Sequence, residues 1–153
     1  QKPSSTELAN IAIGVAQNAR KLGFIPKVAI LSYSNFGNPS GSNTKTINEC
    51  LKILEDKKVS FEFDGEMTAE VALDYNLIKE NYPFCKLSGP ANVLIMPDLY
   101  SANISFKLLQ KMENLSVIGP IMIGGNNPFQ IVQMGASVSD IVNSACISTY
   151  NSL

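Results

Sequence analysis

The chain has 153 residues, about the size of one ordinary domain, and it can therefore bury a hydrophobic core of its own. Apolar residues make up 45% of it and charged residues 16%, a composition that excludes intrinsic disorder. The net charge of −1 leaves no basic face for a nucleic acid, and no apolar run is long enough to cross a membrane.

Several residue types that commonly carry chemistry are scarce. Histidine is absent, which removes Ser-His and Cys-His nucleophile pairs and histidine-ligated zinc, and Arg20 is the only arginine. Cys50, Cys85 and Cys146 are odd in number and far apart, so we expect free thiols in a reducing, cytoplasmic compartment. We expect no metal site in this chain.

Helical and strand patterns alternate along the sequence. A helical period of apolar residues runs from Thr6 to Leu22, with Ser4 or Ser5 as N-cap and Gly23 after the end. The other expected elements are a strand over 28–34, a helix ending near 57–58, a strand over 59–67, a helix opened by Thr68, a strand over 91–99, a helix over 104–112, short strands over 117–125 and 129–133, and a helix over 138–150. The polar stretch up to residue 83 predicts no element of its own. Strands separated by helices predict a layered α/β fold with a largely parallel sheet.

Ligands of parallel α/β sheets bind at the carboxyl ends of the strands, where this chain has three polar loops. The first loop, over 32–43, leads into a helix whose free backbone N–H groups favour anions. Its candidate ligand-binding residues have hydroxyl, amide or no side chains: Ser32, Ser34, Asn35, Ser40, Gly41 and Ser42. The alternative is a surface loop that caps itself.

The other two loops carry fewer candidates. Asp98 and Asn103 follow the strand over 91–99, and Asp98 either orients a ligand hydroxyl or caps the next helix. In the third loop, Gly135 allows a close backbone approach. Ser137 and Asp140, three residues apart, predict a capping box for the last helix.

Eight of the thirteen acidic residues lie between Glu55 and Glu80. Asp64 and Glu66 flank Gly65 and are spaced so that they could act together as acid and base. We favour the alternative, in which this region is a solvated acidic surface.

Five runs, in this order along the chain, resemble the phosphate acetyl/butyryl transferase family: VAILSYSNFGNPSG, FEFDGEMTAEVAL, ANVLIMPDLYSANISFKLLQKM, IGPIMIGGNNP and QMGASVSDIVNSA. The resemblance is strongest to the transferase-like C-terminal portion of bacterial NADP-dependent malic enzymes (malate oxidoreductases). It implies a three-layer α/β/α sandwich of the isocitrate/isopropylmalate dehydrogenase-like, or phosphotransacetylase-like, class, in which two subdomains enclose a cleft for coenzyme A and phosphate. Residues 1–153 resemble the second half of such a domain, so we expect a C-terminal fragment of a larger chain.

The resemblance also implies that no catalytic set is intact. Active transferases of the family carry a serine followed by an arginine beside the reacting thioester and phosphate, where this chain has Gln133 and Met134. Methionine has no hydrogen-bond donor and cannot replace an arginine. Asp140 matches an aspartate of the family, and Lys45 and Lys107 are the cations near the candidate loops.

From the resemblance we expect a regulatory and oligomerisation segment of an NADP-dependent malic enzyme that has lost acyltransferase activity and binds acetyl-CoA as an effector. The parent reaction, oxidative decarboxylation of malate to pyruvate with NADP and a divalent metal (Mg or Mn), then belongs to upstream domains, since this chain has no G-x-G-x-x-G. One alternative is an active phosphate acetyltransferase, which converts acetyl-CoA and phosphate to acetyl phosphate and CoA. Another is a purely structural dimerisation module.

The expected partners are a second copy of the chain, in a homodimer or higher oligomer, and the upstream domains of the same chain. Half of a two-lobed unit exposes apolar surface that must be covered. We expect neither a nucleic acid nor a membrane as partner.

Overall fold

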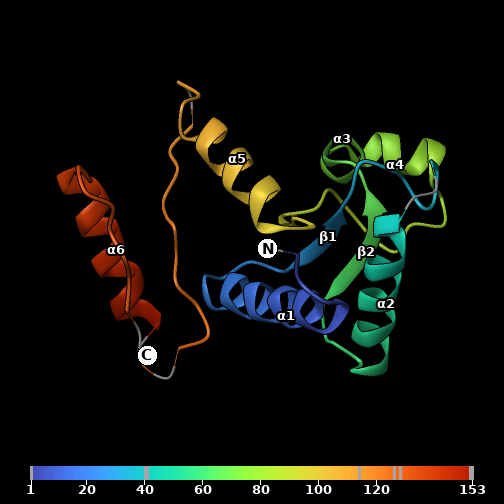
Figure 1. The fold of residues 1–153 in the computed structure, drawn as a ribbon, viewed down its shortest axis with the longest axis horizontal. Coiled ribbons are helices and arrows are strands. Elements are labelled where there is room, and N and C mark those ends of the chain that lie inside the picture. The colour runs from blue at the N-terminus through green and yellow to red at the C-terminus, as the bar shows by residue number, and fades with distance from the viewer. Residues whose placement is uncertain (1, 40–41, 114, 126, 128, 152–153) are drawn as a thin grey trace. The chain divides into compact units, whose positions relative to one another are not determined.

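The computed structural model describes residues 2–39, 42–113, 115–125, 127 and 129–151. Its elements, in chain order, are α1 (Ser5–Lys21), β1 (Lys27–Leu31), α2 (Ser42–Asp56), β2 (Glu62–Met67), α3 (Ala69–Leu73), α4 (Tyr75–Asn81), β3 (Val93–Ile95), α5 (Leu99–Leu109) and α6 (Val138–Asn151) (Figure 1). The chain divides into two units, Gln1–Asn103 and Ile104–Leu153, and the boundary falls within α5.

The first unit is built on a parallel sheet with the strand order β2-β1-β3. β1 lies in the centre, where it pairs with β2 from Lys27 opposite Glu62 and with β3 from Val28 opposite Val93. The strands are joined by helices, as parallel strands require. The prediction of an α/β fold with a parallel sheet is confirmed.

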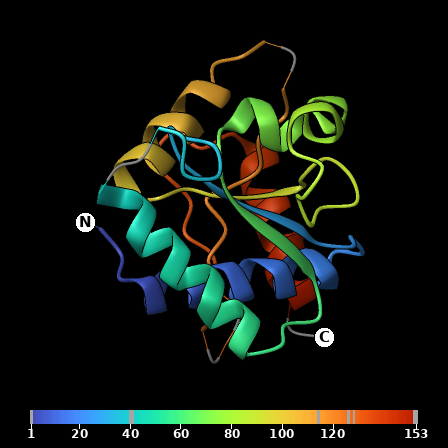
Figure 2. The ribbon, with the colours of Figure 1, turned by 90° about the vertical axis from the view of Figure 1, so that its right-hand side faces the viewer.

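Helices cover both faces of this sheet. Alternate residues of β1 point to opposite faces, so Val28 and Ile30 pack with α1 and α2, whereas Ala29 and Leu31 pack with α3 and α4. Figure 2 shows α1 and α2 on one side of the sheet and the α3–α4 pair on the other. The first unit therefore has the predicted three α/β/α layers.

The sequence of α1 explains both its ends and its position. Ser4 and Glu7 form a capping box, and the helix ends with the basic residues Arg20 and Lys21, which suit its C-terminal dipole. Its buried face consists mainly of alanines, which let the helix approach the sheet closely. The predicted helix over Thr6–Leu22 is confirmed to within one residue.

The helices after β2 are partly as predicted. Thr68 caps α3, as expected, by accepting a hydrogen bond from the backbone N–H of Val71. Helix α4 was not predicted, because the stretch before residue 83 has few apolar residues. Its N-cap is Asp74, whose carboxylate accepts from the N–H groups of Asn76 and Leu77.

In the second unit, the predicted last helix is confirmed as α6, and the predicted capping box is present. The Asp140 carboxylate accepts from the Ser137 N–H at 2.9 Å, and the Ser137 hydroxyl accepts from the Asp140 N–H at 3.2 Å. The expected strands over 117–125 and 129–133 are wrong, since no described residue of these segments belongs to a strand. A strand needs a ladder partner, and here the Gln130 side chain bonds the N–H and the carbonyl of Met122 instead.

The two units differ in how much they bury. The described core residues all lie in the first unit, and none of the described residues from 104 to 150 is buried. Apolar side chains of α5 and α6, among them Ile104, Leu108, Ile141 and Val142, are exposed. No helix within the described ranges is long and apolar enough to cross a membrane.

Candidate functional site

The loop that follows β1, residues 32–39, is fastened to the end of β2 and the start of α3. The backbone N–H of Ser32 donates to the carbonyl of Met67 at 2.9 Å, and that of Phe36 donates to the carbonyl of Glu66 at 2.7 Å. The Asn35 side chain accepts from the N–H of Thr68 at 2.8 Å. The loop is therefore held in one conformation by the strand beside it.

Glu66 lies beneath this loop and is 1% exposed. Its Oε1 accepts hydrogen bonds from the Ser34 hydroxyl at 2.6 Å and from the Gly37 N–H at 3.1 Å. Its Oε2 is buried and has no hydrogen-bond partner among the described residues. The Ser34 hydroxyl is in turn 3.2 Å from the Ser32 hydroxyl.

The structure thus brings three of the predicted residues, Ser32, Ser34 and Asn35, together around Glu66. Ser40 and Gly41 lie outside the described residues, and Ser42 is the first residue of α2. Glu66 was expected on a solvated acidic surface, and that expectation is wrong for this residue. Its place at the carboxyl end of a strand, beside a hydroxyl-rich loop, was the available signal.

Asp64 is also buried, so the prediction of a solvated surface fails for it as well. Its carboxylate accepts from the N–H of Gly65 at 2.9 Å and from the N–H of Lys86 at 2.7 Å. Asp64 and Glu66 therefore have separate partners, and each fixes a different loop. The other acidic residues between Glu55 and Glu80 are exposed or half-buried.

The cysteines in the first unit are not activated. All three cysteines of the chain are free, as predicted. Burial raises the pKa of Cys50 to about 11 and, together with the nearby Asp64, that of Cys85 to about 11. A thiolate is the reactive form, so neither side chain is a nucleophile at neutral pH.

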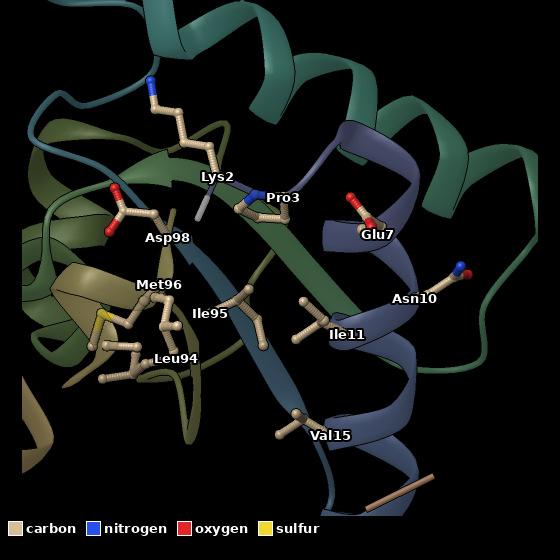
Figure 3. A pocket seen from close by; sticks show the side chains of 12 residues that line it. Lys2, Pro3, Glu7, Asn10, Ile11, Val15, Leu94, Ile95, Met96 and Asp98 are labelled. Carbon is tan, nitrogen blue, oxygen red and sulfur yellow. The ribbon is translucent and has the colours of Figure 1, made fainter.

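Asp98 lies at the edge of a cavity of about 680 Å³ in the first unit. The Ile95 side chain of β3 points toward Ile11 and Val15 of α1, whereas Leu94 and Met96, which also line the cavity, point to the other side of the strand (Figure 3). The carboxylates of Asp98 and Glu7 lie near its upper end in the same view. Lys2 lines the cavity as well, so charges of both signs lie beside its apolar part, and the apolar part suits an apolar group.

Asp98 also has the structural role that the sequence left open. Its carboxylate accepts from the N–H and the hydroxyl of Ser101 at 2.8 Å each, and these bonds lower its pKa. It therefore caps the first turn of α5, which begins five residues earlier than predicted. Asn103 is exposed and lies outside the lining of the cavity.

The remaining predicted residues lie together in the second unit. Gln133, Met134, Gly135 and Asp140 all line a cavity of about 340 Å³. Met134 is fully exposed, and the Lys107 ammonium donates to the side-chain amide oxygen Oε1 of Gln133 at 3.1 Å. Hydrogen bonds from Ser137 hold the pKa of Asp140 below its ordinary value, so this carboxylate is charged and occupied in capping.

The described residues hold the arginine in a structural role and form no cluster of metal ligands. Arg20, the one arginine of the sequence, donates to the hydroxyl of Ser60 at 3.0 Å and to its carbonyl at 2.8 Å, and so connects α1 to the start of β2. Within the described ranges, no three His, Cys, Asp or Glu side chains lie together as a metal ion would require.

Comparisons with known proteins connect both units to one family. Residues 1–149 match the family model described as phosphate acetyl/butaryl transferase. The chain is 50% identical to the NADP-dependent malic enzyme of Rhizobium meliloti over 97% of its own length and 19% of that protein. It is 38% identical to the phosphate acetyltransferase of Helicobacter pylori, over 95% of its own length and 28% of that protein.

Solved structures match over almost the whole chain. The phosphotransacetylase of Streptococcus pyogenes superimposes with a TM-score of 0.91 at 30% identity, and this chain covers 46% of it. The EutD phosphotransacetylase of Staphylococcus aureus gives a TM-score of 0.89 at 30% identity, with 47% of that protein covered. The chain therefore spans about a fifth of the length of the malic enzyme and less than half of these phosphotransacetylases.

Proposed function

The chain belongs to the phosphate acetyl/butaryl transferase family, and from this premise we propose that it is the C-terminal, transferase-like segment of an NADP-dependent malic enzyme. Its role is regulatory: it binds acetyl-CoA and has no acyltransferase activity. The high identity to a malic enzyme, over a part that makes up only a fifth of that protein, supports this assignment.

The observation that carries the loss of activity is the exposed Met134 in the cavity of the second unit. Acyl transfer to phosphate brings two anionic substrates together and needs cationic donors aimed at the developing charge. Met134 supplies none, and the sole arginine is engaged with Ser60 in the first unit. A coupled assay for acetyl phosphate tests this point, and phosphate-dependent turnover by the full-length protein would overturn it.

The effector role is supported by the loop over 32–39, which is fixed by hydrogen bonds and places the half-buried Ser32 at the carboxyl end of the sheet. Coupling between such a site and a distant malate site is typically worth about 1–3 kcal/mol. Calorimetric titration of the full-length protein with acetyl-CoA tests the role. Absence of binding at millimolar ligand, with malate oxidation retained, would remove it.

A second candidate, an active phosphate acetyltransferase, is favoured by one contact. The Lys107 ammonium donates to the side chain of Gln133, which lines this cavity, and so brings a positive charge close to Met134. If Lys107 supplies the missing cation, Lys107→Gln will abolish acetyl phosphate formation, whereas Lys111→Gln, which changes a lysine that lines the cavity, will retain most of it.

A third candidate, a purely structural dimerisation module, is favoured by the exposed apolar side chains of the second unit. We propose self-association of the segment, and contact with the upstream domains of its chain, as the means by which these side chains are covered. Light scattering at several protein concentrations measures the self-association. A monomer that still binds acetyl-CoA would exclude the purely structural role.

Malate oxidation, NADP and the divalent metal are proposed for the upstream domains of the whole protein. The described residues offer no metal cluster, and no step of that reaction is assigned to them. The free cysteines support a cytoplasmic location, where thiols stay reduced.

A further inference from the structure

Three polar side chains at the carboxyl end of the sheet form a hydrogen-bonded chain that leads into the core. Ser32 is half-buried, whereas Ser34 and Glu66 are fully buried. The Ser32 and Ser34 hydroxyl oxygens are 3.2 Å apart, and the Ser34 hydroxyl is 2.6 Å from Glu66 Oε1. This row of hydrogen bonds therefore ends at the Glu66 carboxylate, which is hidden from solvent.

The available hydrogens determine which group donates in each of these hydrogen bonds. The Glu66 carboxylate has no hydrogen to donate, and its Oε1 accepts from the backbone N–H of Gly37. The Ser34 hydroxyl has one hydrogen, and it donates that hydrogen to Oε1. Ser34 can then only accept from Ser32, which makes Ser32 the donor of the outer bond.

The Ser32 hydroxyl has consequently used its own hydrogen. What it offers to a ligand is its oxygen lone pairs, polarised outward by the buried carboxylate at the other end of the chain. A phosphate oxygen is itself only an acceptor and would meet these lone pairs with repulsion. Turning the hydrogen toward a phosphate would break the bond to Ser34 and leave that buried oxygen with one partner fewer.

We infer that Ser32 recognises an N–H group of the ligand, specifically an amide of the pantetheine arm of an acyl-CoA, and that it does not bind a phosphate. This inference rests on the proposed binding of acetyl-CoA and names the part of that ligand that the loop meets.

Two fragments of acetyl-CoA test whether Ser32 binds an amide or a phosphate of that ligand. S-acetylpantetheine carries the amide groups without phosphates, and 3′-phosphoadenosine 5′-diphosphate carries the phosphates without the amides. We expect Ser32→Ala in the full-length protein to weaken binding of acetyl-CoA and S-acetylpantetheine by about two- to tenfold, the range for one hydrogen bond. Binding of 3′-phosphoadenosine 5′-diphosphate should stay at the wild-type level.

Three control variants show whether an effect of Ser32→Ala comes from the loss of its hydroxyl oxygen. Ser32→Thr keeps the hydroxyl and should restore affinity, and Ser32→Cys provides a poor acceptor of similar size if the alanine variant folds badly. Ser88→Ala removes another hydroxyl that donates to a carboxylate, that of Glu62, at the opposite end of β2. We expect Ser88→Ala to leave all three affinities unchanged.

The outcomes distinguish this inference from the proposal beneath it. If the wild-type protein does not bind acetyl-CoA, the effector role falls and the inference falls with it. If the wild type binds acetyl-CoA, two results overturn the inference alone: Ser32→Ala without effect on S-acetylpantetheine, or Ser32→Ala with reduced affinity for the phosphate-bearing ligand.

Discussion

Glu66 shows how one carboxylate can determine the shape of a loop. Burying a carboxylate is costly unless hydrogen bonds compensate, and here Ser34 and Gly37 provide them. Both donors belong to the loop over 32–39, so the carboxylate and the loop stabilise each other. These hydrogen bonds therefore tie the loop to the strand from which Glu66 comes.

Replacing Glu66 by alanine should lower the free energy of unfolding by about 2–5 kcal/mol, because it leaves the Ser34 hydroxyl and the Gly37 N–H unsatisfied. Urea unfolding followed by circular dichroism measures the change. Glu80→Ala, at an exposed position of α4, is the matched control and should change stability by less than about 0.5 kcal/mol. Equal effects of the two substitutions would show that Glu66 does not hold the loop.

The lowered pKa of Glu7 predicts how the free energy of unfolding depends on pH. Hydrogen bonds from the backbone and the side chain of Ser4 hold its pKa below the ordinary value of 4.5. A carboxylate that folding makes more acidic stabilises the fold above its unfolded pKa, and this stabilisation is lost as the pH falls through the lower folded value.

The difference in unfolding free energy between the wild type and Glu7→Gln should therefore be constant from pH 7 to about 5 and disappear progressively below pH 4.5. Urea unfolding of both proteins at several pH values measures it. A difference that persists unchanged at pH 3 would contradict the role of the charged carboxylate.

Among the elements, β2 is where the regular pairing of the sheet changes. The register between β1 and β2 shifts after Ile30 opposite Gly65, so that Leu31 faces Met67 and Glu66 is left out of the pairing. A residue released from the ladder in this way can direct its side chain elsewhere. Here that residue is the one that holds the loop.

Gly65 is required at this shift, and its replacement gives a test. A Cβ at this position would lie 2.7 Å from the Ile30 carbonyl oxygen, and the residue has a φ of +159°. We expect Gly65→Ala to destabilise the protein by about 1–3 kcal/mol more than Gly23→Ala, because Gly23 also has a positive φ but open space around it. Thermal or urea unfolding of the two variants compares them directly. A smaller loss for Gly65→Ala than for Gly23→Ala would mean that the strands adjust at no cost.

The sequence predicts best those elements whose signals are local. Helix α1 has its cap, its apolar period and its terminal charges within the segment itself, and the prediction is confirmed. The segment over 117–125 has the composition of a strand, but a strand also needs a partner, which composition cannot supply. Helix α4 was missed because one cap, Asp74, is a weak signal without an apolar period.

The same distinction applies to the candidate site. Ser32, Ser34 and Asn35 were predicted because hydroxyl and amide residues after a strand form a local pattern. Glu66 was missed because its role depends on a loop more than 25 residues away in the chain, with which it makes tertiary contacts. The direction of the hydrogen-bonded chain, and with it the preference for a donor, depends on these contacts and is not visible in the sequence.

At the scale of the whole molecule, the two units have different structural features and different proposed roles. The first has a core, a layered sheet and a rigid loop, all of which a binding site requires. The second has exposed apolar side chains and a cavity lined in part by the exposed Met134. The function proposed above, binding of acetyl-CoA without acyl transfer, assigns the binding to the first unit and the loss of activity to the second.

One experiment tests this central claim most directly. The full-length protein is titrated with acetyl-CoA in a calorimeter, and the same preparation is assayed for acetyl phosphate formation in the presence of phosphate. We predict saturable binding of acetyl-CoA with no acetyl phosphate above background. Sustained, phosphate-dependent formation of acetyl phosphate would contradict the account.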